Sequence, residues 1–271
     1  MEVETDSEEV DLVRRLSLGL LLANHHGDCL TCASEKDCEL QKIAHFIGVD
    51  DVELGRYRRS EKRFKVDTSN PFFDFDPNKC ILCGICVRTC EEITGTRALH
   101  YAYRGYDTKI STREDKSFIE SRCESCGECI VRCPTGALGI KVFQKPTRQV
   151  KTTCTYCGVG CGILLGRRGN KVVSAAGNRE NIVNKGFLCV KGRFGNSFVN
   201  HKKRLISPLI KKNGSFSEAT WDEAYDLIAS KFKQSKGESF ACLSSAKCSN
   251  EENYILQKFT RAVMKTNSVD H

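Results

Sequence analysis

The sequence lacks an apolar run of about 18 residues, the length that a membrane-spanning helix requires. It also lacks a secretory signal peptide and a twin-arginine leader. Its longest apolar stretch, around Leu16–Ala23, is interrupted by Ser17 and Gly19. We therefore predict a soluble, cytoplasmic protein without membrane insertion, a setting in which cysteines serve as metal ligands rather than as disulfides.

The sequence is rich in cysteine. There are 17 among 271 residues, and most are gathered in sets of three or four. The formal net charge is +8, but this value counts every cysteine as neutral. Because metal-bound thiolates would lower the charge, the basic excess does not indicate a nucleic-acid partner. The length allows one to three domains.

Two cysteine runs in the middle of the chain share the spacing C-x2-C-x2-C-x3-C. This spacing is typical of bacterial ferredoxins with two [4Fe–4S] clusters, in which the fourth cysteine of each run binds the cluster of the other run. A zinc site would instead use two separated C-x2-C pairs around one ion. We therefore predict one cluster on Cys80, Cys83, Cys86 and Cys133, and another on Cys123, Cys126, Cys129 and Cys90.

A further ligand set follows the first segment, which is predicted to be helical from its apolar periodicity. Its spacing is H-x3-C-x2-C-x5-C, and its single imidazole removes one negative charge, which should raise the potential of a bound cluster. A zinc site of the Cys3His type stays open on spacing alone, and so does His26 in place of His25. The predicted ligands are His25, Cys29, Cys32 and Cys38.

The last ligand set has the spacing C-x2-C-x3-C-x27-C. Between its third and fourth cysteines, Ile163–Leu165 and Lys171–Ser174 flank a polar turn and are predicted to form a hairpin. A small, mostly β domain around one cluster fits this pattern, and a zinc ribbon is the alternative by spacing. The predicted ligands are Cys154, Cys157, Cys161 and Cys189.

From His201 onward the composition changes to that of an α/β chain. Capping boxes predict helices that begin after Thr220 and after Ser249, and residues 240–243 are expected to form a buried strand between them. A strand, a polar loop and a helix N-terminus are the elements that hold phosphate-bearing ligands. The first helix is expected to have one apolar face, made of Trp221, Ala224, Tyr225, Ile228 and Phe232. The second helix is expected to turn four residues inward, Ile255, Phe259, Ala262 and Val263.

The His/Cys3 spacing followed by the two-cluster ferredoxin pattern resembles a shared electron-transfer segment. This segment occurs in the large peripheral-arm subunit of respiratory complex I, in multicluster iron-only hydrogenases and in NAD-linked formate dehydrogenase alpha subunits. In these proteins a [2Fe–2S] domain usually precedes it. Nothing here corresponds to that domain, so we expect a [2Fe–2S] domain or subunit to be supplied elsewhere.

The Cys154 to Gly195 stretch closely resembles the N-terminal cluster domain of molybdenum/tungsten bis-pterin oxidoreductases. The resemblance implies that Lys191, two residues past the fourth cysteine, relays electrons between cluster and pterin. The stretch from Leu243 to His271 resembles cytoplasmic formate dehydrogenase alpha subunits. That resemblance implies that a molybdopterin guanine dinucleotide lies beside the loop that carries Ser244, Ser245 and Asn250.

The same resemblance places a metal-ligating cysteine or selenocysteine a few residues beyond His271. We therefore expect this chain to be a segment of a longer subunit, and the pterin cofactor with molybdenum or tungsten to be complete only there. The resemblance does not distinguish the two metals.

These patterns predict an α+β, multi-domain iron–sulfur protein with four [4Fe–4S] clusters. Its expected divisions are a His/Cys3 segment at 1–55, a ferredoxin module at 72–148, a β-rich cluster domain at 149–205 and the beginning of an α/β pterin-binding domain at 206–271. The resemblance implies the electron-transfer part of a formate dehydrogenase, which passes electrons from formate to a flavin- and NAD-binding diaphorase. The alternatives are the complex I large subunit and a stand-alone polyferredoxin-like carrier.

Overall fold

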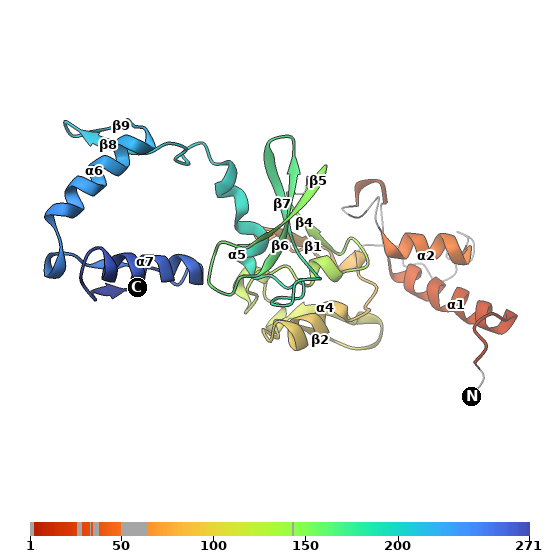
Figure 1. Cartoon of the computed structure of the whole chain (residues 1–271). Coiled ribbons are helices and arrows are strands. Elements are labelled where there is room, and N and C mark those ends of the chain that lie inside the picture. The colour runs from red at the N-terminus through yellow and green to blue at the C-terminus, as the bar shows by residue number, and fades with distance from the viewer. Residues whose placement is uncertain (1–2, 26–28, 33, 35–37, 50–63, 143) are drawn as a thin grey trace. The chain divides into compact units, whose positions relative to one another are not determined.

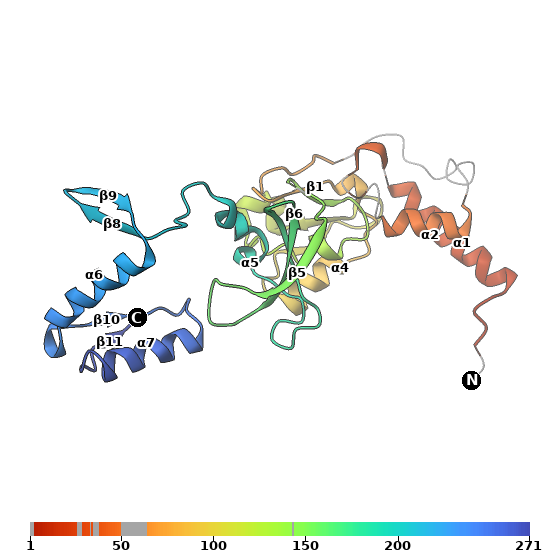
Figure 2. The ribbon, with the colours of Figure 1, turned by 45° about the horizontal axis from the view of Figure 1, so that its top comes forward.

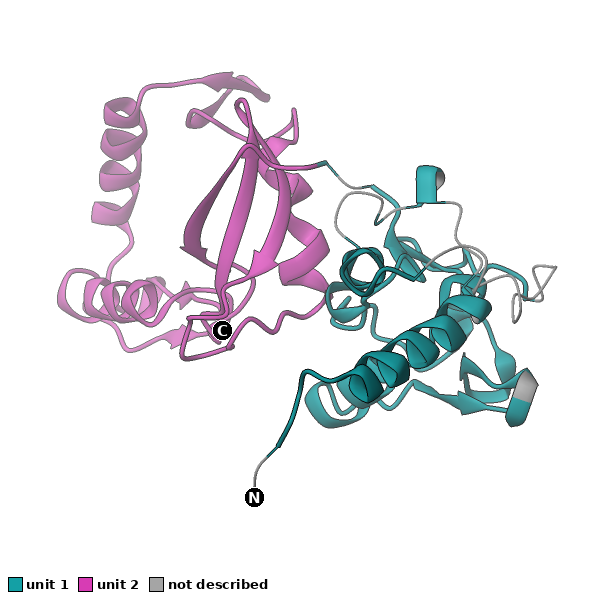
Figure 3. Cartoon of the chain, turned by 90° about the vertical axis from the view of Figure 1, so that its right-hand side faces the viewer, with its two compact units in different colours: residues 1–144 teal, residues 145–271 magenta. Residues whose placement is uncertain are grey.

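A computed structural model describes residues 3–25, 29–32, 34, 38–49, 64–142 and 144–271. The chain divides into two compact units, residues 1–144 and residues 145–271 (Figure 3). Both units mix helices with short strands, so the expected α+β class is confirmed. Within the described ranges, no helix has the length and apolar character needed to cross a membrane.

Two helices begin the first unit, α1 (Glu8–Asn24) and α2 (Glu39–Ile47), and they lie side by side (Figures 1 and 2). Ser7 caps α1 by accepting a hydrogen bond from the Val10 amide at 3.4 Å. Gly48 ends α2 in the left-handed conformation, at φ 70°. The expected helical first segment is therefore present. The buried side chains of this helix pair are Leu18, Ala23 and Leu40.

In its described residues, the remainder of the first unit contains two antiparallel strand pairs, a short α-helix and several 3-10 turns. Its elements are β1 (Phe73–Phe75), α4 (Ile85–Arg88), a π-helical turn (Thr89–Ile93), β2 (Leu99–Ala102), β3 (Lys109–Thr112) and β4 (Leu138–Ile140). Strand β1 pairs with β4, and β2 pairs with β3. Because β1 precedes the first cysteine run and β4 follows the second, their pairing closes both runs into one module.

The core of this module is aromatic. Phe73 and Phe75 are buried, and both rings meet Phe118 edge to face, with centroids 5.0 and 5.7 Å apart. Such pairs stabilise a core by about 0.5–1.5 kcal/mol beyond the area they bury. The three rings therefore give the cysteine loops a rigid support.

The second unit begins with a three-stranded antiparallel sheet, which carries the last ligand set. Its elements are β5 (Arg148–Thr153), β6 (Gly162–Arg168), β7 (Lys171–Gly177), α5 (Val190–Phe194), β8 (Leu209–Lys212), β9 (Ser215–Glu218), α6 (Trp221–Gln234), β10 (Cys242–Leu243), α7 (Asn250–Ala262) and β11 (Val269–Asp270). Strand β6 lies in the centre, and its pairing with β7 confirms the predicted hairpin.

The helices α6 and α7 begin at the two predicted capping boxes, in which Thr220 and Ser249 each exchange hydrogen bonds with the glutamate three residues on. The expected inward face of α7 is wrong in part, because Ile255 is 64% exposed. Trp221, on the apolar face of α6, is 63% exposed. At the far end of α6, the Phe232 ring contacts the Phe240 and Phe259 rings.

The expected buried strand before α7 is also wrong. It is a two-residue strand, β10, paired in parallel with β11, and Leu243 is 80% exposed. A periodic pattern specifies which side of an element is apolar. It does not specify which element covers that side, and no described element covers the Leu243 side chain of β10.

Candidate metal centres

Both ferredoxin cysteine loops have the same local backbone geometry. In each loop the residue two after the first cysteine has a left-handed conformation, Leu82 at φ 57° and Ser125 at φ 55°. This conformation directs its amide to the sulfur of the first cysteine, and the Leu82–Cys80 and Ser125–Cys123 N···Sγ distances are both 3.4 Å. Amides directed at sulfur stabilise negative charge on a ligating thiolate.

The two loops supply three cysteines each to two different cavities, and the fourth cysteine crosses over. One cavity is lined by Cys80, Cys83, Cys86 and Cys133, which we call the Cys80 set. The other is lined by Cys90, Cys123, Cys126 and Cys129, which we call the Cys90 set. The structure thus brings together the same groups of four that the spacing predicts.

Burial makes these thiols hard to ionise without a cation. It raises the pKa of Cys80 to about 11 and that of Cys86 to about 12, and the neighbouring thiols of the Cys80 set add to the shift. It also raises the pKa of Cys123 and Cys129 in the Cys90 set. Iron bound in each cavity would reverse this balance by holding the thiolate form.

The thiols surround a volume rather than a point. No group of three or more His, Cys, Asp or Glu side chains in the described part of the chain converges as a single metal ion requires. A zinc ion draws its thiolates to within about 2.3 Å of one centre. In a cubane each thiolate binds a different iron, so the thiols stay apart. Four thiols around one cavity are a donor set that a [4Fe–4S] cluster can use.

Polar side chains that the sequence analysis did not single out hold these loops. Asn70 is only 1% exposed and donates to the Ser125 hydroxyl at 2.8 Å. Glu128, equally buried, lines the cavity of the Cys90 set and pairs with Arg132. Glu128 and Arg132 have the i, i+4 spacing of an ion pair in the sequence. The partner of Asn70 lies 55 positions away and leaves no such signal.

The His25 set consists of His25, Cys29, Cys32 and Cys38, and three of these residues contact the ferredoxin module. The Nδ1 atom of His25 donates to the Lys79 carbonyl at 2.9 Å. The thiol of Cys38 lies 3.8 Å from the Pro134 carbonyl oxygen. A 3-10 turn links Cys29 to Cys32, whose sulfur lies beside Gly136. His26, the alternative ligand, lies outside the described residues.

The hydrogen bond of His25 fixes its tautomer. A carbonyl oxygen only accepts, so Nδ1 carries a proton, and in the neutral ring the lone pair is then on Nε2. Metal-binding histidines usually have this arrangement, in which the second ring nitrogen donates to a carbonyl or a carboxylate. The contact therefore suits His25 to a ligand role through Nε2.

The Cys154 set consists of Cys154, Cys157, Cys161 and Cys189, and it lies at one end of the three-stranded sheet. The Cys154 amide donates to the Cys161 carbonyl at 2.8 Å, which closes the loop between β5 and β6. Burial raises the pKa of Cys161, and the thiols of the other three members add to the shift, so all four lie near one another. Cys189 is the N-cap residue of α5.

Lys191 lies in the first turn of α5, two residues from Cys189. Its side chain is exposed and makes no hydrogen bond or ion pair with another residue that the structure describes. The next residue, Gly192, has no side chain, and a Cβ there would lie 3.6 Å from Cys154 Sγ. The turn that carries Lys191 is therefore in close contact with the Cys154 set.

The loop with the expected pterin contacts lies against the Cys154 set. The Gly158 amide, between Cys157 and Cys161, donates to the Ala246 carbonyl at 3.0 Å. Within the loop, the Ser244 side chain bonds to Asn253, and the Ser245 hydroxyl accepts from the Lys247 amide at 3.1 Å. Asn250 is the first residue of α7. The structure therefore brings the predicted cluster loop and the predicted pterin loop together.

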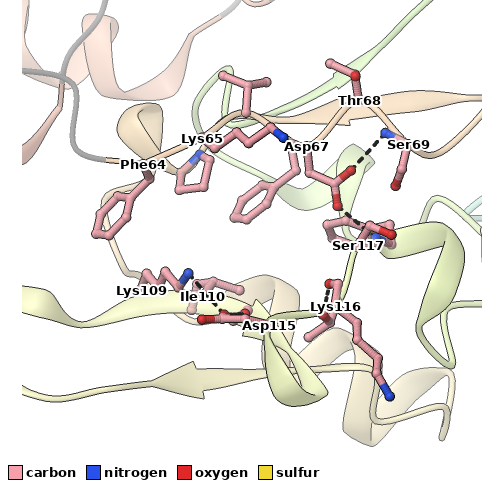
Figure 4. Close-up of a pocket in the computed structure, with 16 residues that line it drawn as sticks. Phe64, Lys65, Asp67, Thr68, Ser69, Lys109, Ile110, Asp115, Lys116 and Ser117 are labelled. Atoms are coloured by element: carbon pink, nitrogen blue, oxygen red, sulfur yellow. Dashed lines mark hydrogen bonds and ion pairs between the residues drawn. The ribbon is translucent and has the colours of Figure 1, made fainter.

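A separate cavity of about 420 Å3 lies between residues 64–69 and strand β3 with the turns after it (Figure 4). Its charged groups are largely paired within the protein. Lys109 bonds to Asp115 at 3.0 Å, and Asp67 accepts from the amides of Ser69 and Phe118. No cysteine lines this cavity, and we assign it to the support of the hairpin.

Four family models match successive parts of the chain. They are the NADH-ubiquinone oxidoreductase-G iron-sulfur binding region at residues 14–53, the 4Fe-4S dicluster domain at 54–137, the molybdopterin oxidoreductase Fe4S4 domain at 147–201 and molybdopterin oxidoreductase at 204–271.

Several curated relatives match along the whole chain. An NADH-quinone oxidoreductase subunit of Rhizobium meliloti (strain 1021) is 33% identical over 277 residues, which cover 100% of this chain and 32% of the relative. A provisionally named formate dehydrogenase of Staphylococcus aureus (strain USA300) is 30% identical, with coverage of 100% and 32%. The chain therefore spans about a third of the length of these relatives.

Among solved structures, an NAD+-reducing [NiFe]-hydrogenase in its H2-reduced state is similar to part of the chain. The two share 29% sequence identity with a TM-score of 0.47, and the match covers 53% of this chain and 60% of the hydrogenase chain.

Proposed function

Because the chain belongs to the molybdopterin oxidoreductase family, whose iron–sulfur and pterin domains it carries in succession, we propose that it is the electron-transfer part of a formate dehydrogenase. In the complete subunit formate would be oxidised to CO2, with release of one proton and two electrons. This chain would conduct the electrons towards a flavin- and NAD-binding diaphorase. The proposal includes a cytoplasmic location and a [2Fe–2S] domain or subunit supplied elsewhere.

The observation that carries this proposal is the arrangement of the four ligand sets. A [4Fe–4S] cluster bound to each set would supply one-electron redox chemistry. The His25, Cys80 and Cys90 sets belong to the first unit, and the Cys154 set belongs to the second. We retain 1–55, 72–148, 149–205 and 206–271 as the proposed domain limits.

The residues of the chain have separate tasks in this proposal. The thiols and His25 bind the clusters, while the amides of Leu82 and Ser125 stabilise the added charge of the reduced state. The buried rings of Phe73 and Phe118, which line the cavity of the Cys90 set, exclude water from it. Solvent exclusion and hydrogen bonds to sulfur are the two means by which a protein sets a cluster potential.

At the other end of the chain, we propose Lys191 as the relay between the Cys154 set and a pterin. Its exposed side chain, two residues after Cys189, supports this role, because a cation can stabilise negative charge that passes between two redox groups. The contact between Gly158 and Ala246 supports placing the cofactor beside Ser244, Ser245 and Asn250. We propose molybdopterin guanine dinucleotide with molybdenum or tungsten, in the complete subunit.

The experiment that tests this function uses the complete subunit with its diaphorase partner. Under anaerobic conditions, formate should bleach the iron–sulfur absorbance, and NAD+ should restore it with formation of NADH and CO2. Hydrogen carbonate or acetate in place of formate should leave the absorbance unchanged. A complete, metal-loaded subunit whose clusters dithionite reduces and formate does not would contradict the proposal.

A second candidate, the large subunit of an NADH:quinone oxidoreductase, is favoured by the 33% identity with the Rhizobium meliloti protein. A metal assay on the complete subunit separates the two candidates. About one molybdenum or tungsten per subunit supports the formate enzyme, whereas iron without either metal supports the respiratory subunit.

A further inference from the structure

The His25 set contacts a short stretch of backbone next to the Cys80 set. We call this stretch the junction, and it consists of Lys79 and residues 134–136. Lys79 directly precedes Cys80, and residues 134–136 directly follow Cys133, so both of its parts are joined to ligands of the Cys80 set. Three members of the His25 set contact the junction, at the Lys79 carbonyl, the Pro134 carbonyl and Gly136.

Thr135 is the side chain that ties the junction together. It is only 2% exposed, and its hydroxyl donates to the Lys79 carbonyl at 2.9 Å. The same carbonyl accepts from His25 Nδ1 at 2.9 Å. The Thr135 oxygen also lies 3.6 Å from Cys133 Sγ. One hydroxyl therefore contacts a ligand of the Cys80 set directly and a ligand of the His25 set through one shared carbonyl.

A hydroxyl has one proton, so it donates well to one acceptor at a time. In the structure the Lys79 carbonyl, at the shorter distance, receives that proton. Extra negative charge on Cys133 strengthens the sulfur as an acceptor and draws the proton towards it. The Lys79 carbonyl would then accept from His25 alone, and a stronger bond at Nδ1 makes a histidine ligand more electron-donating.

We propose that Thr135 is a positioning residue that couples the His25 and Cys80 centres, through a hydroxyl proton shared between the Lys79 carbonyl and the Cys133 sulfur. This inference rests on the proposed function, because it requires a cluster on each set. Loss of the Thr135 hydroxyl should therefore lower the midpoint potentials of both centres. Loss of the hydroxyl removes a donor that stabilises charge on Cys133, and it leaves the Lys79 carbonyl as a stronger acceptor for His25.

The test is a redox titration of the whole chain, followed by electron paramagnetic resonance (EPR), with Thr135→Val and Thr135→Ser. Valine keeps the shape of threonine without the hydroxyl, so the midpoint potentials of both centres should fall. Serine keeps the hydroxyl, so both potentials should stay at the wild-type values. Thr112→Val is the matched control, because Thr112 is also buried and also donates to a carbonyl, that of Lys116.

Iron analysis of the wild-type chain distinguishes a failure of the proposed function from a failure of the proposed coupling. A chain that binds no iron at the His25 and Cys80 sets contradicts the proposed function. A chain with both clusters, in which Thr135→Val shifts neither potential or only one, overturns the coupling and leaves the proposed function intact. A shift of equal size in Thr112→Val also overturns it.

Should Thr135→Val assemble poorly, a pulsed EPR measurement on the unmodified chain gives the answer. The nitrogen hyperfine coupling of His25 should change when the Cys80 centre is reduced, and Thr135→Ser should keep that change. A coupling that is the same in both states of the Cys80 centre would overturn the inference.

Discussion

A single added methyl group at Gly136 tests how closely the His25 set is seated on the ferredoxin module. An ideal Cβ at Gly136 would lie 2.2 Å from Cys32 Sγ. Ordinary van der Waals contact begins at 3.4 Å, so the sulfur would have to move by about 1.2 Å. A ligand constellation tolerates displacements of about 0.5 Å. Gly136→Ala should therefore displace Cys32 and remove the cluster of the His25 set alone.

The assay is iron and acid-labile sulfide analysis of the anaerobically reconstituted chain, with the EPR spectrum of the reduced protein. Iron should fall by about a quarter, because one of four proposed centres is lost, and only the signal of the histidine-ligated centre should disappear. Gly19→Ala is the matched control, since a Cβ there meets no atom within 4 Å. Full iron content in Gly136→Ala, with an unchanged spectrum, would refute the placement of Cys32 against the junction.

Three further predictions concern other parts of the chain. Gly84→Ala adds a Cβ at φ 71° and 2.1 Å from the Tyr101 hydroxyl, so thermal unfolding should show a loss of at least about 1 kcal/mol together with iron loss at the Cys80 set. Lys191→Ala in the complete enzyme should change unfolding free energy by less than about 0.5 kcal/mol and keep all iron, while stopped-flow absorbance shows slower cluster reduction by formate; an unchanged rate would exclude the relay role. Although burial raises the pKa of Asp115, hydrogen bonds from Ser111, Tyr103 and Lys109 lower it to about 2. Because that pKa is depressed in the folded state, the stability that the Asp115 carboxylate contributes is complete above the ordinary value of 3.8 and is lost as the pH falls towards about 2. In urea unfolding, the difference in unfolding free energy between the wild type and Asp115→Asn should therefore shrink across that pH window. A difference that stays constant would contradict this prediction.

The cysteine spacing predicted the local parts of the sites well, because a short loop can place its thiols in few ways. Cys133 lines the cavity of the Cys80 set, and Cys90 lines the other, as the crossed pattern requires. The ligand role of these thiols stays a prediction until iron is measured. The β6–β7 hairpin and both capping boxes were equally local and equally readable.

The contacts that connect the sites could not be predicted from the sequence. Thr135 meets Lys79 across 56 positions, and His25 meets the same carbonyl across 54. Their shared partner is a backbone carbonyl, which carries no residue identity and so leaves no motif. The inward face of α7 was predicted wrongly in part for a related reason. Amphipathic spacing shows which side of a helix is apolar, but it does not show which element covers that side, and Ile255 is exposed.

The metal and sulfide content of the whole chain after anaerobic reconstitution, read together with Mössbauer spectroscopy, distinguishes iron–sulfur clusters from zinc at the four ligand sets. We expect equal iron and sulfide, about four cubanes per chain, and no bound zinc. Replacement of Cys133 by serine should lower the yield of the Cys80 centre and spare the Cys90 centre. Stoichiometric zinc without sulfide, or loss of the Cys90 centre in that variant, would contradict the ligand sets on which the account depends.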